Sequence, residues 1–218
     1  MSALPLIFTS SWASGINAYA VVFLLGLFGV TGLSDEVPDA LQRTDVLVAA
    51  GVLFLVEVVA DKVPYLDTAW DVLHTVVRPI AGGVVAALLA GQDGSLPQLA
   101  AGAVGGTTAL VSHLVKAATR LAVNTSPEPA SNIGVSLLED LAVAGLVVFA
   151  LFHPVLAATL AGLLLALSVL LVFLLVRRIR RSWRALRERW ARRRAARAAR
   201  AGHHDGTAPP TVGGPVAG

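Results

Sequence analysis

The chain has 218 residues, of which 56% are hydrophobic and 14% are charged. Soluble domains are usually about 45–50% apolar and ~25% charged, so this composition argues against an ordinary soluble enzyme. The absence of cysteine excludes disulfides, thiolate metal ligands and cysteine nucleophiles. The net charge of +3 combines two unlike regions: residues 1–176 carry five Lys and Arg against twelve Asp and Glu (−7), and residues 177–218 carry twelve Arg against two acids (+10).

Six apolar stretches follow one another along residues 1–176, each close to the ~17–25 residues that a helix needs to cross a membrane. Because backbone groups in lipid must bond within their own segment, we predict that all six are helices. The expected fold class is therefore all-α, a transmembrane helical domain of about six spans. The stretches lie at about 13–33, 44–63, 72–91, 97–122, 133–152 and 154–176.

Three points along this domain carry weak helix formers or proline. Residues 14–17 read Ser-Gly-Ile-Asn at the entrance of the first stretch, which predicts a cap, a break or a short re-entrant piece. Residues 124–132 are too rich in proline to be helical and predict a loop. His153 and Pro154 predict a tight turn between the last two stretches, because proline resists continuing the preceding helix.

The placement of Lys and Arg predicts an orientation. The Arg-rich tail should remain cytoplasmic, since cytoplasmic segments of membrane proteins carry an excess of Lys and Arg. Counting back through six spans places the N-terminus on the cytoplasmic side as well. The longest outer loop, residues 34–45, then holds four acids and one Arg, which agrees with this topology. We therefore expect a multi-pass protein of the bacterial plasma membrane with both termini cytoplasmic.

Residues 177–200 predict a basic amphipathic helix. Two tryptophans, one isoleucine and one leucine fall within roughly 60° of arc at 100° per residue, and arginines fill the remaining circumference. We expect this helix to bind anionic lipid headgroups at the inner leaflet, with a solvated flank and nucleic-acid binding as the less favoured alternatives. The expected lipid-contacting residues are Arg177, Arg178, Arg180, Arg181, Trp183 and Trp190. Residues 201–218 are rich in Gly, Pro and Thr and predict a disordered tail.

Charged and polar side chains recur inside the apolar stretches, although a charge at mid-bilayer costs about 2.5–3.5 kcal/mol. Spacings of three and four residues place each set on one helix face. In the predicted topology four such faces lie at one depth, which predicts either a closed ion-pair network or a water-filled cavity open to the cytoplasm. The candidate cavity residues are Asn17, Glu57, Asp61, Lys62, Asp71, His74, Arg78, His113, Lys116, Arg120, Asn124, Asn132, Glu139 and Asp140.

Glu57 and His113 are the deepest of these residues by their position in the stretches. A carboxyl group and an imidazole near mid-membrane are the usual parts of a proton relay. His74 and His113 with nearby carboxylates offer a divalent-metal site as an alternative. No tight ligand motif or cofactor fingerprint supports that alternative, so we expect neither a metal nor a cofactor.

Five strings of this sequence together resemble one protein family. They are SGINAYA (14–20), VEVVADKVP (56–64), DTAWDVLHTVVRPIAG (67–82), KAATRLAVNTSPEPASN (116–132) and SLLED (136–140). The family is one of bacterial multi-pass membrane proteins catalogued as domain of unknown function 4126. The resemblance covers about residues 10–155 and leaves the last helix and the Arg-rich tail outside its most recognisable part. It implies a membrane location and no activity, and its motifs coincide with the polar faces, which favours a functional site there.

Three functions remain open from the sequence. The favoured one is a small channel or secondary transporter for an unidentified small solute or ion, with proton coupling through Glu57 and His113. The second is a membrane-embedded enzyme or flippase acting on lipid phosphates, in which the cationic and histidine side chains bind phosphate. The third is a membrane scaffold acting through the basic tail. No catalytic motif is present, so catalysis is not expected, and the sequence leaves the oligomeric state open.

Overall fold

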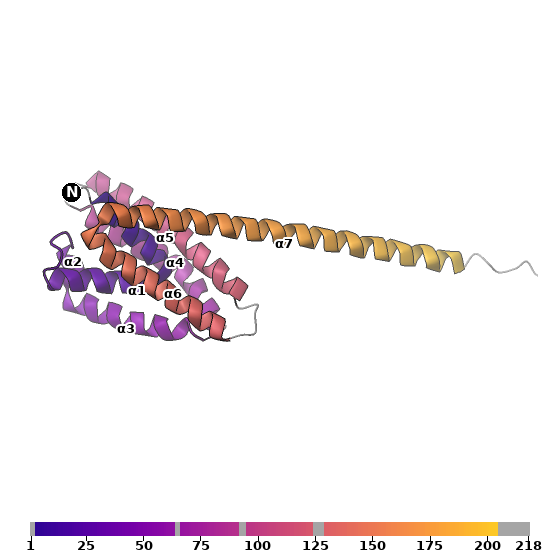
Figure 1. Cartoon of the computed structure of the whole chain (residues 1–218), viewed down its shortest axis with the longest axis horizontal. Coiled ribbons are helices and arrows are strands. Elements are labelled where there is room, and N and C mark those ends of the chain that lie inside the picture. Colours follow the sequence, from indigo (N-terminus) through magenta and orange to yellow (C-terminus); the bar gives the residue numbers. More distant parts are fainter. Residues whose placement is uncertain (1–2, 64–65, 92–94, 124–128, 205–218) are drawn as a thin grey trace, which may run out of the picture. The chain divides into compact units, whose positions relative to one another are not determined.

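The computed structural model describes residues 3–63, 66–91, 95–123 and 129–204. Within these ranges the chain is all-α: it forms seven helices and no strand (Figure 1). The helices are α1 (Leu4–Val30), α2 (Asp39–Gln42), α3 (Thr44–Ala60), α4 (Leu66–Leu89), α5 (Ser95–Val123), α6 (Pro129–Phe152) and α7 (Pro154–His204). Each of the six apolar stretches corresponds to one long helix, so the all-α part of the predicted fold class is confirmed. The short helix α2 lies in the segment that was expected to be a loop.

Four of the helices are long and apolar enough to cross a membrane. They contain the candidate spans Leu4–Val30, Leu66–Leu89, Ile133–Phe152 and Pro154–Arg178. The chain is therefore a candidate multi-pass membrane protein. Helix α3 has only 17 residues, and α5 carries a row of polar side chains that lowers its mean hydropathy. Neither α3 nor α5 is among the four candidate spans, so the predicted total of six spans remains a prediction.

The predicted start of the first helix at residue 13 is wrong, because α1 begins at Leu4. Proline is tolerated in the first turn of a helix, and Pro5 occupies that turn. The hydroxyl groups of Thr9 and Ser11 donate to the carbonyl groups of Pro5 and Ile7, at 2.9 and 2.7 Å. These polar residues therefore bond within the helix instead of ending it, and residues 14–17 lie in its middle.

The predicted irregularity in residues 14–17 is confirmed as a break. Asn17 has φ −148° and ψ 93°, which is extended and not helical backbone, so α1 consists of two helical halves that meet at this residue. The Asn17 side-chain oxygen accepts a hydrogen bond from the N–H of Ala20 at 2.9 Å. This is the bond that an N-cap residue makes, so Asn17 caps the second half of α1.

Helix α1 lies at the centre of the bundle, where it contacts α3, α4, α5 and α6. Its most apolar window is 56% buried, whereas the corresponding window of α7 is only 6% buried. Val21 and Leu25 on α1 are fully buried in the core. The break at Asn17 is therefore inside the protein, and the polar faces of the surrounding helices have α1 as their common neighbour.

Helices α4 and α5 pack closely through glycines. A Cβ atom on Gly105 would lie 2.3 Å from the Ala86 Cβ, and one on Gly83 would lie 3.0 Å from the Gly102 carbonyl oxygen. Lipid tails are as apolar as the side chains, so membrane helices associate through such close van der Waals packing. This close approach brings the polar residues of α4 and α5 within bonding distance of one another.

Helix α7 begins at Pro154, directly after His153, and the predicted tight turn is confirmed. The chain divides into two compact units, Met1–Val172 and Phe173–Gly218. Residues 177–200 are helical, as predicted, and they belong to the same helix α7 as the preceding apolar residues.

Helix α7 extends to His204, four residues into the segment 201–218 that was predicted to be disordered, and the preceding run of Ala and Arg favours helix. Residues 205–218 lie outside the described residues. The side chains of Arg177, Arg178, Arg180 and Arg181 are exposed. Those of Trp183 and Trp190 are not described, so the lipid-binding face stays a prediction.

Candidate functional site

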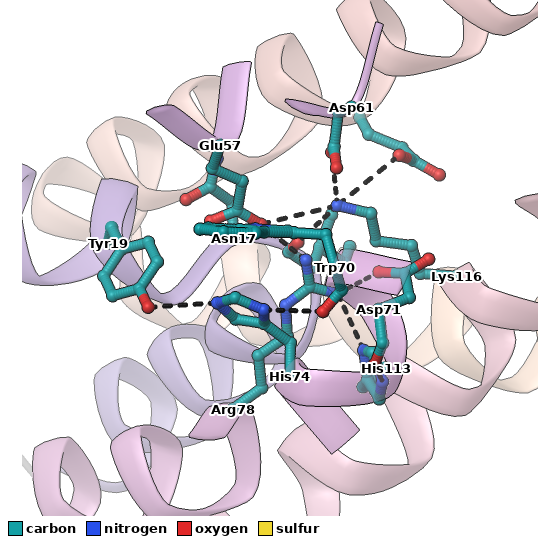
Figure 2. Close-up of polar contacts among 12 residues, drawn as sticks. Asn17, Tyr19, Glu57, Asp61, Trp70, Asp71, His74, Arg78, His113 and Lys116 are labelled. Carbon is teal, nitrogen blue, oxygen red and sulfur yellow. Dashed lines mark hydrogen bonds and ion pairs between the residues drawn. The ribbon is translucent and has the colours of Figure 1, made fainter. Parts of the chain in front are cut away.

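The polar faces of α3, α4, α5 and α6 meet beside the break in α1 (Figure 2). Seven ionisable side chains form one set of linked ion pairs, which we call the ion-pair network. Its members are Glu57, Asp61, Asp71, Arg78, Lys116, Arg120 and Glu139. Six of these side chains are at most 5% exposed, and Glu139 is 17% exposed. All seven were among the residues predicted from the sequence to share one site.

Arg78 on α4 joins carboxylates from two helices. Its Nη2 atom donates to Glu57 Oε1 of α3 at 2.5 Å, and its Nη1 atom donates to Asp71 Oδ1 at 3.2 Å. The same Nη1 atom lies 2.7 Å from His113 Nδ1 on α5. Arg78 therefore holds α3 and α5 against α4 through charge-assisted hydrogen bonds.

His113 is held as a neutral imidazole by its neighbours. Its Nε2 atom lies 3.1 Å from the backbone carbonyl oxygen of Asp71, which can only accept, so Nε2 carries the hydrogen. The Nδ1 atom then has a free lone pair and accepts from Arg78. Both ring nitrogens are used, and the side chain is completely buried.

Lys116 on α5 links the two halves of the ion-pair network. Its ammonium nitrogen lies 2.6 Å from Asp61 Oδ2 and 3.5 Å from Glu57 Oε1, and Figure 2 shows it between these two carboxylates. It also lies 4.0 Å from Glu139 Oε2 on α6. One cation therefore bridges α3, α5 and α6.

Arg120, one turn further along α5, completes the second half. Its Nη2 atom donates to Glu139 Oε2 at 2.6 Å and to Asp61 Oδ2 at 3.3 Å. Its Nη1 atom donates to the backbone carbonyl of Asp61 at 2.8 Å, which satisfies a carbonyl just beyond the end of α3. Arg120 therefore ties the end of α3 to α6.

The broken helix α1 contributes backbone atoms to the same site. The carbonyl oxygen of Ile16 accepts from Lys116 at 2.9 Å, and that of Gly15 accepts from Arg78 at 3.4 Å. The side-chain amide of Asn17 donates to Asp140 Oδ1 on α6 at 3.2 Å. A break in a buried helix needs such partners, because an unpaired backbone group away from water is costly.

The ion-pair network carries an excess of negative charge. Four carboxylates are matched by three cations. The carboxylate oxygens Glu57 Oε2 and Asp71 Oδ2 are buried without a hydrogen bond from any described residue, and so is the Arg78 Nε atom. A buried carboxylate without a compensating charge is strongly unfavourable, so the excess of one carboxylate is a feature that the function of this network has to account for.

His74 forms a separate chain of hydrogen bonds with two residues that the sequence did not single out. Its Nδ1 atom donates to the carbonyl of Trp70 at 2.7 Å, so its Nε2 atom accepts from the Tyr19 hydroxyl at 3.0 Å. The Trp70 and His74 rings lie 4.6 Å apart. Trp70 comes four residues before His74, so helical spacing was a signal available for Trp70. Tyr19 comes only two residues after Asn17, and no such spacing pointed to it.

Other predicted residues lie apart from these contacts. The Lys62 ammonium donates to the Val58 carbonyl at 2.8 Å, at the end of its own helix, instead of to the ion-pair network. Asn124 and the Asn132 side chain lie outside the described residues. Within the described part of the chain, no three His, Asp or Glu side chains are grouped so that they could hold a metal ion.

Comparison with known proteins places the chain in a family. The family model described as Domain of unknown function (DUF4126) matches residues 4–174. This range is wider than the predicted resemblance over residues 10–155, and it includes most of the apolar part of α7. No curated protein and no solved structure matches the chain. The chain therefore belongs to the DUF4126 family, and the match covers the whole helical bundle with its ion-pair network.

Proposed function

We propose that this protein is a small proton-coupled membrane transporter or channel, in which Glu57 takes up and releases the proton. The observation that carries this proposal is the broken helix α1. Its carbonyl groups at Gly15 and Ile16 are held by the cationic side chains of Arg78 and Lys116. Discontinuous helices that present backbone groups to a charged site inside a bundle are typical of secondary transporters.

In this proposal all six long helices cross the membrane, with both termini cytoplasmic. The outer face of α3 supports a crossing, because Val48, Val52, Leu55 and Val59 are exposed at spacings of four, three and four residues. That spacing makes one apolar stripe suited to lipid. The 17 residues of α3 span about 26 Å at a rise of 1.5 Å per residue, close to the thickness of a hydrocarbon core.

Glu57 is the proposed proton site because its charge holds two cations at once. Its Oε1 atom lies 2.5 Å from Arg78 Nη2 and 3.5 Å from Lys116 Nζ. Protonation would remove this charge and weaken both contacts. Arg78 and Lys116 would then shift toward their remaining carboxylates. Their hydrogen bonds to the carbonyl groups of Gly15 and Ile16 on α1 would change as a result. Proton uptake would in this way favour a second arrangement of α1, which is the basis of coupled transport.

His113 has a positioning role in this mechanism and does not carry the proton. It already uses both ring nitrogens as a neutral group, one toward Arg78 and one toward the backbone of Asp71. A second proton on His113 would place a cation against the Arg78 guanidinium in a buried site. The imidazole instead orients Arg78 toward Glu57.

The lipid-phosphate alternative has less support from the same contacts. Arg78, Lys116 and Arg120 each bond to at least one carboxylate. A phosphate group would have to displace these internal partners and enter a region where the cations are at most 2% exposed. We therefore favour proton coupling over phosphate chemistry.

Glu57→Gln tests the proposal in proteoliposomes that contain a pH-sensitive dye, with a potassium diffusion potential driving proton entry. The expected result is wild-type proton entry above that of protein-free vesicles and at least a tenfold loss in Glu57→Gln. Glu36→Gln is the matched control, because Glu36 lies exposed in the segment between α1 and α2. Wild-type flux in a folded Glu57→Gln protein would remove Glu57 from the mechanism.

A further inference from the structure

A small chamber lies beside the ion-pair network, between α1, α5, α6 and α7. Its volume is about 150 Å³. The polar residues on its walls are Ser112, Lys116, Thr119, Glu139 and Ser168, and the rest of the lining is apolar. Two of these residues, Lys116 and Glu139, belong to the ion-pair network, so the chamber adjoins the charged site directly.

Glu139 is the member of the ion-pair network that is least enclosed. Its side chain is 17% exposed, whereas those of the other six members are at most 5% exposed. Its Oε2 atom accepts both hydrogen bonds from Arg120. Its other carboxylate oxygen accepts no hydrogen bond from a described residue. Glu139 lines the chamber and has one oxygen that can accept a further hydrogen bond.

The polar groups on the chamber wall are mainly acceptors. The Ser112 hydroxyl donates to the Trp12 carbonyl at 2.8 Å, and the Thr119 hydroxyl donates to the Val115 carbonyl at 3.0 Å. Each hydroxyl has used its hydrogen and has lone pairs remaining. Lys116 is already bonded to Asp61 and to the Ile16 carbonyl. These oxygen acceptors, on a wall that is otherwise largely apolar, offer hydrogen-bond partners to water molecules in the chamber.

The size of the chamber agrees with water. A water molecule needs roughly 10–15 Å³ of such space and two to four polar partners, so the chamber has room for several molecules. It is smaller than the ~300–1,000 Å³ of pockets that bind drug-sized ligands.

We propose that this chamber is the aqueous access route through which protons reach the ion-pair network. This inference rests on the proposed proton coupling and adds where the proton enters. A hydronium ion in the chamber gives its proton to the free oxygen of Glu139, leaving a water molecule and a neutral carboxylic acid. The loss of that charge weakens the hold of Glu139 on Arg120 and Lys116. Lys116 also contacts Glu57, so the two carboxyl groups are coupled through one ammonium group.

The absence of cysteine makes a direct test of hydration available. Ser168→Cys places the only thiol of the chain on the chamber wall. Leu167→Cys is the matched control, since the neighbouring Leu167 is at nearly the same depth and is 54% exposed on the apolar outer face. A thiol reacts as its thiolate, which water supports and hydrocarbon does not. We expect a small water-soluble methanethiosulfonate to modify Ser168→Cys at least tenfold faster than Leu167→Cys in proteoliposomes.

Ser168→Trp tests the route itself, because the larger side chain fills the chamber. We expect Ser168→Trp to reduce proton flux at least tenfold and Leu167→Trp, which faces outward, to leave it unchanged. Both proteins are first compared with wild type by size-exclusion elution, to show that they are folded.

The outcomes separate this inference from the proposed function. Equal thiol reactivity at the two positions, or wild-type flux in a folded Ser168→Trp protein, would overturn the access route. A loss of flux in Glu57→Gln would still support the proposed function in that case. Fast labelling of Ser168→Cys in a protein without any proton flux would show a hydrated chamber and refute both the route and proton coupling.

Discussion

Arg78 shows how much of the site depends on single contacts. It is completely buried and bonds to Glu57, Asp71 and His113. Removing one partner of a buried ion pair leaves an uncompensated charge and destabilises proteins by about 3–5 kcal/mol. The arginines on the surface have no such importance, because an exposed ion pair contributes about 0–1 kcal/mol.

Arg78→Ala should therefore lower the thermal stability of the purified protein in detergent strongly, and Arg43→Ala should leave it nearly unchanged. Arg43 pairs with Asp45 at 2.7 Å, but these side chains are 67% and 65% exposed. The measurement is the fraction of protein that remains monodisperse after heating, followed by size-exclusion fluorescence. Equal melting temperatures for the two variants would contradict the view that the ion-pair network holds the bundle together.

At the residue scale, the sequence predicted which side chains gather and not how they pair. Spacings of three and four residues place Asp71 and Arg78, or Lys116 and Arg120, on one face of a helix. They do not say that Lys116 bonds to Asp61 while Arg78 bonds to Glu57. Those choices depend on the rotation and depth of each helix relative to its neighbours. Backbone partners such as the Ile16 carbonyl carry no side-chain signal at all.

At the scale of elements, the contact between α4 and α5 decides whether the polar faces meet. Gly105 on α5 faces Ala86 of α4 and also Ser11 of α1, so a side chain at this position has no room. Inserting atoms into a well-packed interior typically costs about 1–3 kcal/mol. By contrast, Gly145 on α6 has no atom within 4 Å of its added Cβ position.

Gly105→Ala should destabilise the protein by about 1–3 kcal/mol, and Gly145→Ala should be neutral or stabilising. The Cβ of Gly105→Ala would lie 2.3 Å from the Ala86 Cβ and 2.8 Å from the Ser11 hydroxyl oxygen. Alanine favours helix over glycine by about 1 kcal/mol, which makes Gly145→Ala the matched control. Unfolding in increasing denaturing detergent, followed by circular dichroism, measures both. Similar stability of the two variants would show that α4 and α5 can separate without cost.

Helix boundaries were predictable where proline or a hydrophobic edge marks them, and not elsewhere. The turn at His153 and Pro154 separates α6 from α7 as predicted. The start of α1 at Leu4 was not predicted, because residues 9–11 are polar and do not extend the apolar stretch. In the structure the hydroxyl groups of Thr9 and Ser11 donate to carbonyl groups of their own helix, so these residues are accommodated within it. The break at Asn17 was within the predicted segment, but only the structure places it at the centre of the bundle.

For the whole molecule, the charge distribution predicts the direction in which the protein crosses the membrane. The Arg-rich residues 177–200 should remain on the cytoplasmic side, and the acidic segment of residues 34–45 should lie outside. If α1 crosses the membrane and the total number of crossings in the chain is odd, these two segments lie on the same side. The sidedness of these two segments therefore separates an even total, in which α3 and α5 both cross or neither crosses, from an odd total, in which only one of them crosses.

Single cysteines introduced into the cysteine-free chain answer it. In intact cells, a membrane-impermeant maleimide should label Asp35→Cys and should label Arg200→Cys only after permeabilisation. Asp35 lies exposed between α1 and α2. Labelling of both positions in intact cells, or of neither, would contradict six crossings with a cytoplasmic tail.

The amino-acid sequence alone predicts a bundle of long apolar helices whose polar residues lie on single faces. Composition and helical spacing are local properties, and they decide helix formation and the direction of each face. The folded structure adds that α1 is central, that Arg78 and Lys116 hold its broken backbone, and that a chamber adjoins Glu139. These features depend on contacts between residues far apart in the chain, such as Arg78 with Gly15 and Lys116 with Ile16. Their physical cause is close packing through glycines, which sets the distances between helices that no single helix specifies.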